Sequence, residues 1–308
     1  MEDRMRTIGL ALLACTMFVV ASPDVAFAAK VETCAPLGKS KAALQALKRA
    51  GWQIDDEAER HRFVLALADC NGAPDPEIRD GLAFEATQHL LRKGLINDAT
   101  LAQLSGKLQA QLVELDKSGF RRSFAALNLS EIARTDRVKA WMTPEQRAQM
   151  VTAAVDYMRS IKDYRGFDKV GGYRHAVAHT ADLMMQLALN PAVDKEDLAR
   201  MRNAIAVQVA PASASYITGE PERLARPILF MAQRGAFTDQ EWTQWLAQFA
   251  GPGALGSWDN AFQSEAGLAR RHNVTAFLSA IYVNAQASGA DALKSLAAGA
   301  MEALKKLP

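Results

Sequence analysis

Apolar residues recur at helical spacing along almost the whole sequence, whereas clean runs of alternating apolar and polar residues are missing. The chain is 49% hydrophobic but only 7% aromatic, and alanine and leucine dominate its apolar residues. Such side chains suit closely packed helices better than sheets. We therefore predict an all-α protein. Its helices are expected at residues 38–50, 55–69, 76–92, 97–115, 119–134, 143–161, 173–189, 194–210, 221–234, 238–249, 258–268, 270–287 and 290–306.

Residues that begin helices stand at several of these boundaries. Asp75 precedes Pro76, which places an N-cap carboxylate before a proline in the first helical turn. Thr143 also precedes a proline, and Thr238 is followed three residues later by Glu241, which is the spacing of a capping box. These signals predict helix starts near residues 76, 143 and 238.

The predicted helices form consecutive antiparallel pairs, and polar residues recur near the start of every second helix. The recurring residues are Arg79-Asp80, Arg121-Arg122, Arg174-His175, Glu222-Arg223 and Arg270-Arg271-His272. Their separation is close to the length of one helical hairpin, which is typical of an α-solenoid, a HEAT-like stack of helix pairs. A compact α-helical domain and a closed α/α toroid are the alternatives. No linker rich in proline, glycine or serine divides residues 29–308, so we predict a single domain there.

Residues 1–28 have the layout of a secretory signal peptide. Arg4 and Arg6 precede an apolar run, and an A-x-A cleavage site ends at Ala28. The sequence before Cys15 also resembles a lipoprotein cleavage box, and a retained anchor is a third interpretation. We favour simple export, which predicts a periplasmic or secreted protein. No membrane span is expected after signal cleavage, because no later segment is long and apolar enough.

The net charge indicates which partners are not expected to bind, and the number of cysteines indicates whether a disulfide is expected. The formal net charge is +2 and no block of basic residues marks a path for nucleic acid, so nucleic acid is not an expected partner. Cys34 and Cys70 are the two cysteines that follow the signal segment. An even number in an oxidising compartment predicts a Cys34–Cys70 disulfide, with two buried free thiols as the alternative.

One segment combines an apolar helical pattern with several polar side chains. Arg174, His175, His179 and Asp182 are expected on the helix at 173–189. A helix that is apolar nearly all round is buried, so its polar groups must pair, line a groove or bind a ligand. The two histidines and Asp182 would share one face, as an incomplete set of zinc ligands or as a general acid/base pair. The alternative is a buried network in which Asp182 accepts hydrogen bonds from the histidines and Arg174.

Two further polar residues on predicted helices are candidates for an ion pair or a nucleophile, namely Glu85 and Ser123. Glu85 stands on a largely apolar helix and needs a partner, for which Arg122 is a candidate. Ser123 is not part of a G-x-S-x-G or S-x-x-K motif, so a packing role is favoured over that of a nucleophile. Phosphate-binding glycine loops are absent from the sequence, so nucleotide binding is not expected.

Stacked hairpins would place the recurring polar residues in a row at the N-terminal ends of the helices. In one interpretation they are caps and salt bridges between repeats. In the other they line a polar groove, where helix N-termini and arginines attract an acidic ligand. The groove candidates are Asp80, Arg122, Arg174, His175, His179, Asp182, Glu222 and Arg223.

Five segments carry a resemblance to a known family. They are R-D-G-L-A at 79–83, R-S-F-A-A-L at 122–127, D-Y-R-G at 163–166, R-H-A-V-A-H-T-A-D-L at 174–183 and E-R-L-A at 222–225. Over about residues 60–285 the chain resembles the bacterial family called domain of unknown function 2785. The resemblance implies a helical-repeat fold without an assigned activity, and it transfers no catalytic residue.

The sequence favours a binding or scaffolding module over an enzyme. Its expected partner is a protein, a peptide or an acidic small ligand. No cofactor is expected, except that His175, His179 and Asp182 could hold a divalent metal such as zinc. The alternative function is a metal-dependent or acid/base hydrolase centred on these three residues.

Overall fold

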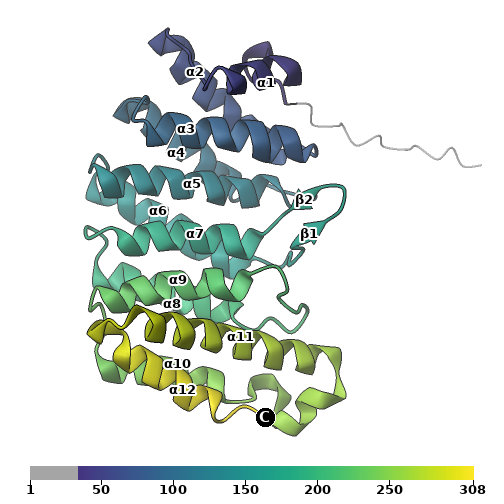
Figure 1. The fold of residues 1–308 in the computed structure, drawn as a ribbon, viewed down its shortest axis with the longest axis vertical. Coiled ribbons are helices and arrows are strands. Elements are labelled where there is room, and N and C mark those ends of the chain that lie inside the picture. The colour runs from purple at the N-terminus through teal and green to yellow at the C-terminus, as the bar shows by residue number, and fades with distance from the viewer. Residues whose placement is uncertain (1–33) are drawn as a thin grey trace, which may run out of the picture. The chain divides into compact units, whose positions relative to one another are not determined.

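The computed structural model describes residues 34–308, and the predicted signal peptide at residues 1–28 lies outside the described residues. Within this part, regular structure is helical apart from two short strands, which confirms the all-α class (Figure 1). The α-helices are α1 (Lys41–Arg49), α2 (Glu57–Leu67), α3 (Glu85–Arg92), α4 (Asp98–Gln111), α5 (Arg121–Val138), α6 (Pro144–Ser160), α7 (Ala176–Leu189), α8 (Lys195–Gln208), α9 (Glu220–Gln233), α10 (Asp239–Ala250), α11 (Glu265–Ser288) and α12 (Lys294–Leu304).

Shorter helical segments join or extend these helices. They are η1 (Pro36–Gly38), η2 (Ala68–Gly72), the π-helix η3 (Glu77–Phe84), η4 (Gly253–Leu255), η5 (Trp258–Gln263) and η6 (Asp291–Leu293). The π-helix η3 runs directly into α3, so the two form one continuous rod.

Side-chain caps begin the helices where the sequence predicted starts. Thr143 forms a capping box with Gln146 at the start of α6, and Thr238 forms one with Glu241 at the start of α10. The Asp75 carboxylate accepts a hydrogen bond of 2.9 Å from the backbone N–H of Glu77, at the start of η3. Each cap satisfies backbone donors that the first helical turn leaves without an internal partner.

The helices are arranged in two layers. In the first layer, α3, α5, α7, α9 and α11 each pack against the next, as Figure 1 shows for the layer nearest the viewer. The helices between them in sequence, α4, α6, α8 and α10, lie behind, where α6 packs on α8. Helix α2 packs on α4, and α12 packs on α10. This is a stack of helix pairs; that the repeat is of HEAT type stays a prediction.

Small side chains bring the first-layer helices together. Ala125 and Ala126 of α5 and Ala178 and Ala181 of α7 are fully buried, and α5 and α7 form the most extensive helix contact. Buried apolar residues from α1 through α12 form one continuous cluster. The alanine-rich composition therefore allows close helix packing, as the sequence predicted, because short side chains let helix backbones approach closely.

The end of the chain differs from the predicted pair of helices at 258–268 and 270–287. A short 3-10 segment, η5, is followed by the single long helix α11. Ser264 separates them, because its hydroxyl accepts a hydrogen bond of 3.0 Å from the backbone N–H of Gly267 and caps α11. Gly267 also lies so close to the backbone of Ala261 that any larger residue would collide with it.

A hairpin that the sequence did not predict precedes α7. Its strands β1 (Phe167–Asp168) and β2 (Gly172–Tyr173) pair antiparallel, and Gly172 takes a positive φ of 74° at the turn. With only two residues each, these strands are too short to show an alternating pattern.

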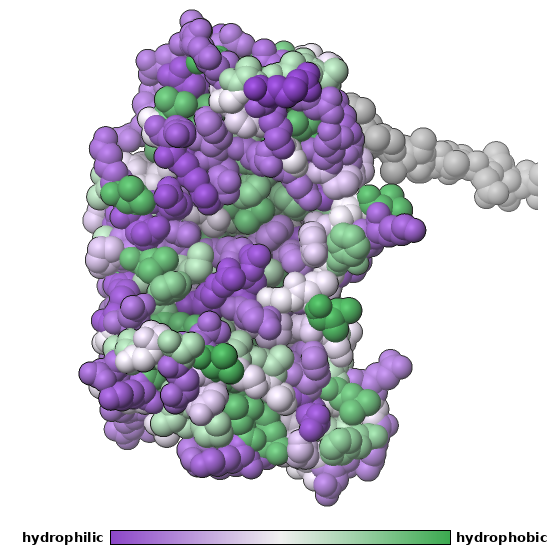
Figure 2. All heavy atoms as spheres, viewed as in Figure 1, coloured by the Kyte–Doolittle hydropathy of each residue, from purple (hydrophilic) through white to green (hydrophobic). Residues whose placement is uncertain are grey.

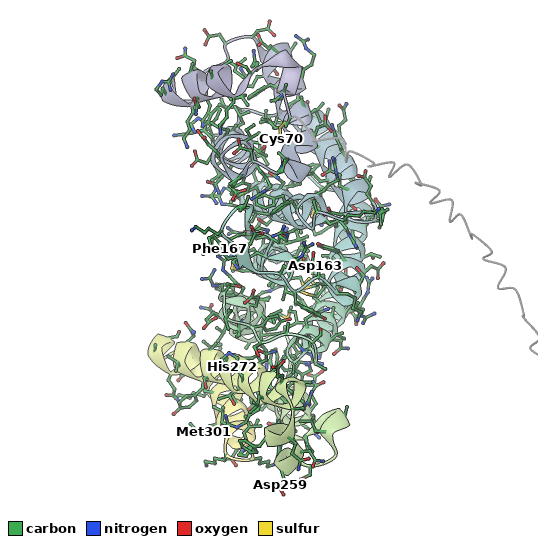
Figure 3. All side chains as sticks on the ribbon, turned by 90° about the vertical axis from the view of Figure 1, so that its right-hand side faces the viewer. Cys70, Asp163, Phe167, Asp259, His272 and Met301 are labelled. Carbon is green, nitrogen blue, oxygen red and sulfur yellow. A yellow bond between two sulfur atoms is a disulfide. The ribbon has the colours of Figure 1, made fainter. Side chains whose placement is uncertain are left out.

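We call the loops before α5, α7 and α9 the loop edge, namely residues 112–120, 161–175 and 209–219. They lie side by side. Arg165 donates to the Ser118 carbonyl at 3.2 Å, and a side chain at Gly166 would collide with Thr218. Figure 3 looks onto this edge and labels two of its residues, Asp163 and Phe167.

The predicted disulfide between Cys34 and Cys70 is confirmed. It ties the first described residue to η2, next to the helical rod of η3 and α3. No helix in the described part of the chain is long and apolar enough to cross a membrane.

Candidate functional site

The helix α7 begins later than predicted, and this changes the geometry of its polar residues. Helix α7 starts at Ala176, so Arg174 and His175 precede it instead of lying on it. His175 has a left-handed backbone (φ 54°, ψ 37°), and the Arg174 N–H donates to the Gly166 carbonyl at 2.8 Å. The hairpin turns the chain at this point, so the expected stripe along one helix becomes a cluster around its first turn.

His179 is the centre of this cluster and is buried. Its Nδ1 lies 2.8 Å from the Ser123 hydroxyl of α5, and that hydroxyl donates to the Arg174 carbonyl. The single proton of the Ser123 hydroxyl is donated to the Arg174 carbonyl. In the hydrogen bond between Ser123 and His179, the donor must therefore be a protonated Nδ1 of His179, and the serine oxygen accepts. Burial, followed by the nearby His175, lowers the pKa of His179 to about 3. The imidazole is therefore a neutral donor that holds two helices together.

His175 lies beside His179, with ring centroids 5.7 Å apart, and is also buried. Its ring stacks on Tyr173 with centroids 4.4 Å apart, and its Nε2 lies 3.9 Å from a carboxylate oxygen of Glu220 on α9. Burial lowers the pKa of His175, although Glu220 opposes this shift. The gap between His175, Glu220 and Tyr164 is too small for one water molecule.

The Phe120 ring of the loop edge contacts two arginines, Arg79 of η3 and Arg174. The Arg79 guanidinium lies 3.9 Å from the Phe120 ring centroid and that of Arg174 lies 4.3 Å from it. Arg79 is almost completely buried, donates to the Gly171 carbonyl at 2.7 Å and pairs with Asp80. Arg174 pairs with Asp168, and the N–H of Gly171, followed by Arg174, lowers the pKa of Asp168 to about 2. Sequence reasoning could not find this arrangement, because the stacked groups come from distant segments.

Asp182 belongs to a different set of contacts from the one predicted. Its carboxylate pairs with Arg223 of α9 and lies 3.9 Å from Arg226. His179 bonds to Ser123 instead, Arg174 pairs with Asp168, and His175 lies 3.9 Å from Glu220. The prediction that Asp182 is their acceptor is therefore wrong. Burial raises the pKa of Asp182, although Arg223 and Arg226 oppose it. Figure 2 shows hydrophilic side chains gathered over α7 on this face.

The three proposed zinc ligands do not form a ligand set. Among residues 34–308, no group of three or more histidine, cysteine, aspartate or glutamate side chains is placed to hold a metal ion. His179 instead bonds to Ser123, and Asp182 bonds to Arg223. Two of the intended ligands thus already have partners.

Arg122 lies apart from the cluster, and its expected partner is bound elsewhere. Glu85 pairs with Lys48 of α1, so the predicted Glu85–Arg122 pair is wrong. The Arg122 guanidinium donates to the Leu112 carbonyl at 2.7 Å and to the Ser160 hydroxyl at 3.0 Å. It also lies 4.7 Å from the Tyr157 ring centroid.

The groove candidate Glu222 lies apart from these residues and is exposed in the first turn of α9.

Arg122 lines a cavity of about 720 Å³ between α4 and α6. The walls are Gln109, Leu112 and Val113 on one side and Ala148, Gln149, Thr152, Ala153, Asp156, Tyr157 and Ser160 on the other. A second cavity of about 110 Å³ continues between the same helices and shares Gln109 and Gln149 with the first. Together they form what we call the α4–α6 groove, where α4 and α6 hardly touch.

The fold and these sites define an all-helical protein of two stacked helix layers, with a buried polar cluster at one edge and a groove in the second layer. The family model for proteins of unknown function DUF2785 matches residues 104–283, and the chain belongs to this family. The match starts later than the resemblance suggested, near residue 60, but it contains every residue that lines the larger cavity. No match was found among curated proteins or among solved structures.

Proposed function

We propose that this protein is a binding module and that its ligand occupies the α4–α6 groove. The observation that carries the proposal is the cavity of about 720 Å³ with Arg122 in its wall. Binding cavities for small molecules have volumes of roughly 300–1,000 Å³ and combine an apolar lining with a few placed polar groups. Leu112, Val113 and Ala153 supply apolar walls here, and Arg122 supplies a fixed cation.

The contacts of Arg122 suit it to hold an acidic group. Its Nε and Nη2 atoms are held by the Leu112 carbonyl and by Ser160, which fixes the orientation of the guanidinium. Its Nη1 forms no hydrogen bond with the described residues and is left for a ligand. A pre-oriented arginine binds a carboxylate more strongly than a mobile one, because little side-chain entropy is lost on binding.

These features favour a ligand with an apolar body and one acidic group. An apolar peptide segment with a carboxylate and an acidic small molecule both meet this description. The polar cluster around His179 is a poorer candidate for binding, because Ser123 and His179 are buried and bonded to each other.

The hydrolase alternative receives less support from the geometry. Ser123 and His179 are within hydrogen-bonding distance, but the serine proton is directed at the Arg174 carbonyl. A general base would need a free lone pair on the nitrogen that faces the hydroxyl. Ser123 is also completely buried, so a substrate could not reach it without movement of the loop edge.

Export to the periplasm or beyond is part of the proposal. The Cys34–Cys70 disulfide supports it, because such bonds persist in oxidising compartments. A binding module with a groove on one layer of helices would act there on a peptide or small acidic molecule.

Fluorescence titration with anilinonaphthalene sulfonate, an apolar anion, tests this function. Because one charge-assisted hydrogen bond is worth about 1.5–3 kcal/mol, Arg122→Ala should weaken binding at least about tenfold. Arg159→Ala is the matched control, because it removes an exposed arginine of the groove helix α6 that does not line the cavity, and it should bind as the unaltered protein does. Added salt should weaken binding. Equal affinity of the two variants would contradict the proposal.

A further inference from the structure

Exposed apolar side chains gather on the loop edge. Val113, Leu115, Phe167, Val170, Tyr173 and Ile217 are all large, and their exposed fractions range from 45% for Tyr173 to 87% for Leu115. Figure 2 shows several hydrophobic side chains standing out at the edge that carries the hairpin, next to hydrophilic ones. Exposed apolar groups that cluster in neighbouring loops mark an interaction surface more often than scattered ones do.

The lysines of the same loops lack partners, whereas the acidic residues do not. Lys117, Lys162 and Lys169 are exposed and form no ion pair within residues 34–308. Every acidic side chain of these loops has a partner within the protein. Asp163 pairs with Arg165, Asp168 pairs with Arg174, Glu114 lies 3.8 Å from Arg121, and Asp116 accepts from the backbone N–H groups of Gly119 and Arg122. The edge therefore presents free positive charge beside apolar side chains.

We propose that the loop edge docks on the surface of a phospholipid bilayer that contains anionic headgroups. Lysines next to aromatic and aliphatic side chains are the combination that interfacial binding requires, since apolar groups enter the acyl boundary while cations stay at the headgroups. Phe167 and Tyr173 stack with centroids 4.9 Å apart across the hairpin and present an aromatic pair for the interface. The hairpin holds Lys169 and Val170 together at its tip.

Co-sedimentation with vesicles tests the proposal, using the purified exported protein. Vesicles of phosphatidylethanolamine with phosphatidylglycerol should bind it, and vesicles of phosphatidylcholine should bind it far less. One lysine near an anionic surface contributes about fivefold in affinity, so reversing its charge and adding a second anion should cost at least about tenfold. The variant Lys169→Glu/Val170→Asp should therefore lose most of its binding.

The chain offers a matched control at the opposite end of α5. Val138 and Lys139 are also an exposed valine–lysine pair, and the exposed fraction of Val138 is 63%. The variant Val138→Asp/Lys139→Glu should bind anionic vesicles as the unaltered protein does. The N-terminal segment is the same in all three proteins, so differences report on the substituted sites alone.

A second measurement does not depend on loss of binding. Phe167→Trp should show a blue-shifted tryptophan emission when anionic vesicles are added, because the indole enters a less polar environment. Val138→Trp should not shift. The proposal is overturned if the protein binds both vesicle types equally, if the Lys169→Glu/Val170→Asp variant binds as well as its control, or if the emission of the Phe167→Trp variant is unchanged. An edge that recognises another protein would give these results.

Discussion

The Ser123 hydroxyl and Nδ1 of His179 lie 2.8 Å apart, although 56 residues separate them in the chain. Both side chains are buried, and the serine also donates to the Arg174 carbonyl. The pair therefore joins the start of α5 to the first turn of α7 and to the loop before it. Three polar groups that would otherwise be buried without partners satisfy one another.

This relationship predicts that Ser123→Ala destabilises the protein by about 2–3 kcal/mol, because it leaves the His179 N–H and the Arg174 carbonyl buried without partners. Urea denaturation measures the change. Ser130→Ala is the control on the same helix, since Ser130 only bonds to the Leu127 carbonyl of its own helix. Its effect should stay within about 0.5 kcal/mol. Equal losses for both variants would show that the Ser123–His179 bond contributes nothing specific.

Acid should destabilise the protein through His179. Its folded pKa of about 3 lies below the ordinary value of 6.5, so the unfolded chain binds a proton more readily. Stability from this group is complete above pH 6.5 and falls as the pH drops toward 3. His179→Asn keeps a donor in the position of Nδ1 but does not titrate.

The unaltered protein should therefore lose about 2 kcal/mol more than His179→Asn between pH 7 and pH 5. Denaturant melts at the two pH values give the difference. His175 contributes with the same sign in both proteins, since burial also lowers its pKa. Parallel pH profiles would mean that His179 takes up a proton in the folded state.

The cluster shows what the sequence could and could not predict. The capping signals at Thr143 and Thr238 act locally, within one helical turn, and both were correct. The start of α7 was placed too early, because helical periodicity continues into Tyr173 while the hairpin removes Arg174 and His175 from the helix. The Ser123–His179 bond depends on how two helices pack, which no local pattern encodes.

Two buried aspartates should differ in their contribution to stability. Asp136 is almost completely buried and accepts from Arg147, from Asn190 and from the backbone N–H groups of Trp141 and Met142. Asp182 pairs only with arginines that can turn into solvent, since the side chains of Arg223 and Arg226 are 35% and 49% exposed.

We expect Asp136→Ala to cost about 3–5 kcal/mol, the range for breaking a buried pair. Asp182→Ala should cost no more than about 1 kcal/mol, because its removal also relieves the burial of a charge. Denaturant melts of the two variants rank the sites. A loss at Asp182 as large as that at Asp136 would restore it as the centre of a buried network.

Removing the disulfide should destabilise the N-terminal end of the described chain. The bond closes a loop between residues separated by 36 positions, for which the chain-entropy model gives about 4 kcal/mol. The Cys34→Ser/Cys70→Ser variant should show this loss in denaturant melts of the exported protein. Thiol labelling of the unfolded, unreduced protein should find neither cysteine free, and labelling of both would exclude the bond.

The α4–α6 groove could not be predicted from the sequence, for a different reason. Arg122 was a groove candidate because it recurs in a polar row, yet it lines a cavity in the other layer, away from His175. A cavity forms where two helices fail to make contact. The apolar pattern of α4 and α6 is the same whether or not the helices touch, so that pattern cannot predict the cavity. The packing of Arg122 against Leu112, Tyr157 and Ser160 fixed its direction.

Calorimetric titration of the protein with dodecanoate, an apolar chain with one carboxylate, tests the central claim most directly. Ala148 is an exposed residue in the wall of the groove, so Ala148→Trp should fill the space while leaving the core packing unchanged. The account predicts saturable binding to the unaltered protein and none to Ala148→Trp, with equal free energies of unfolding. Absence of saturable binding, or equal affinity of the two proteins, would contradict it.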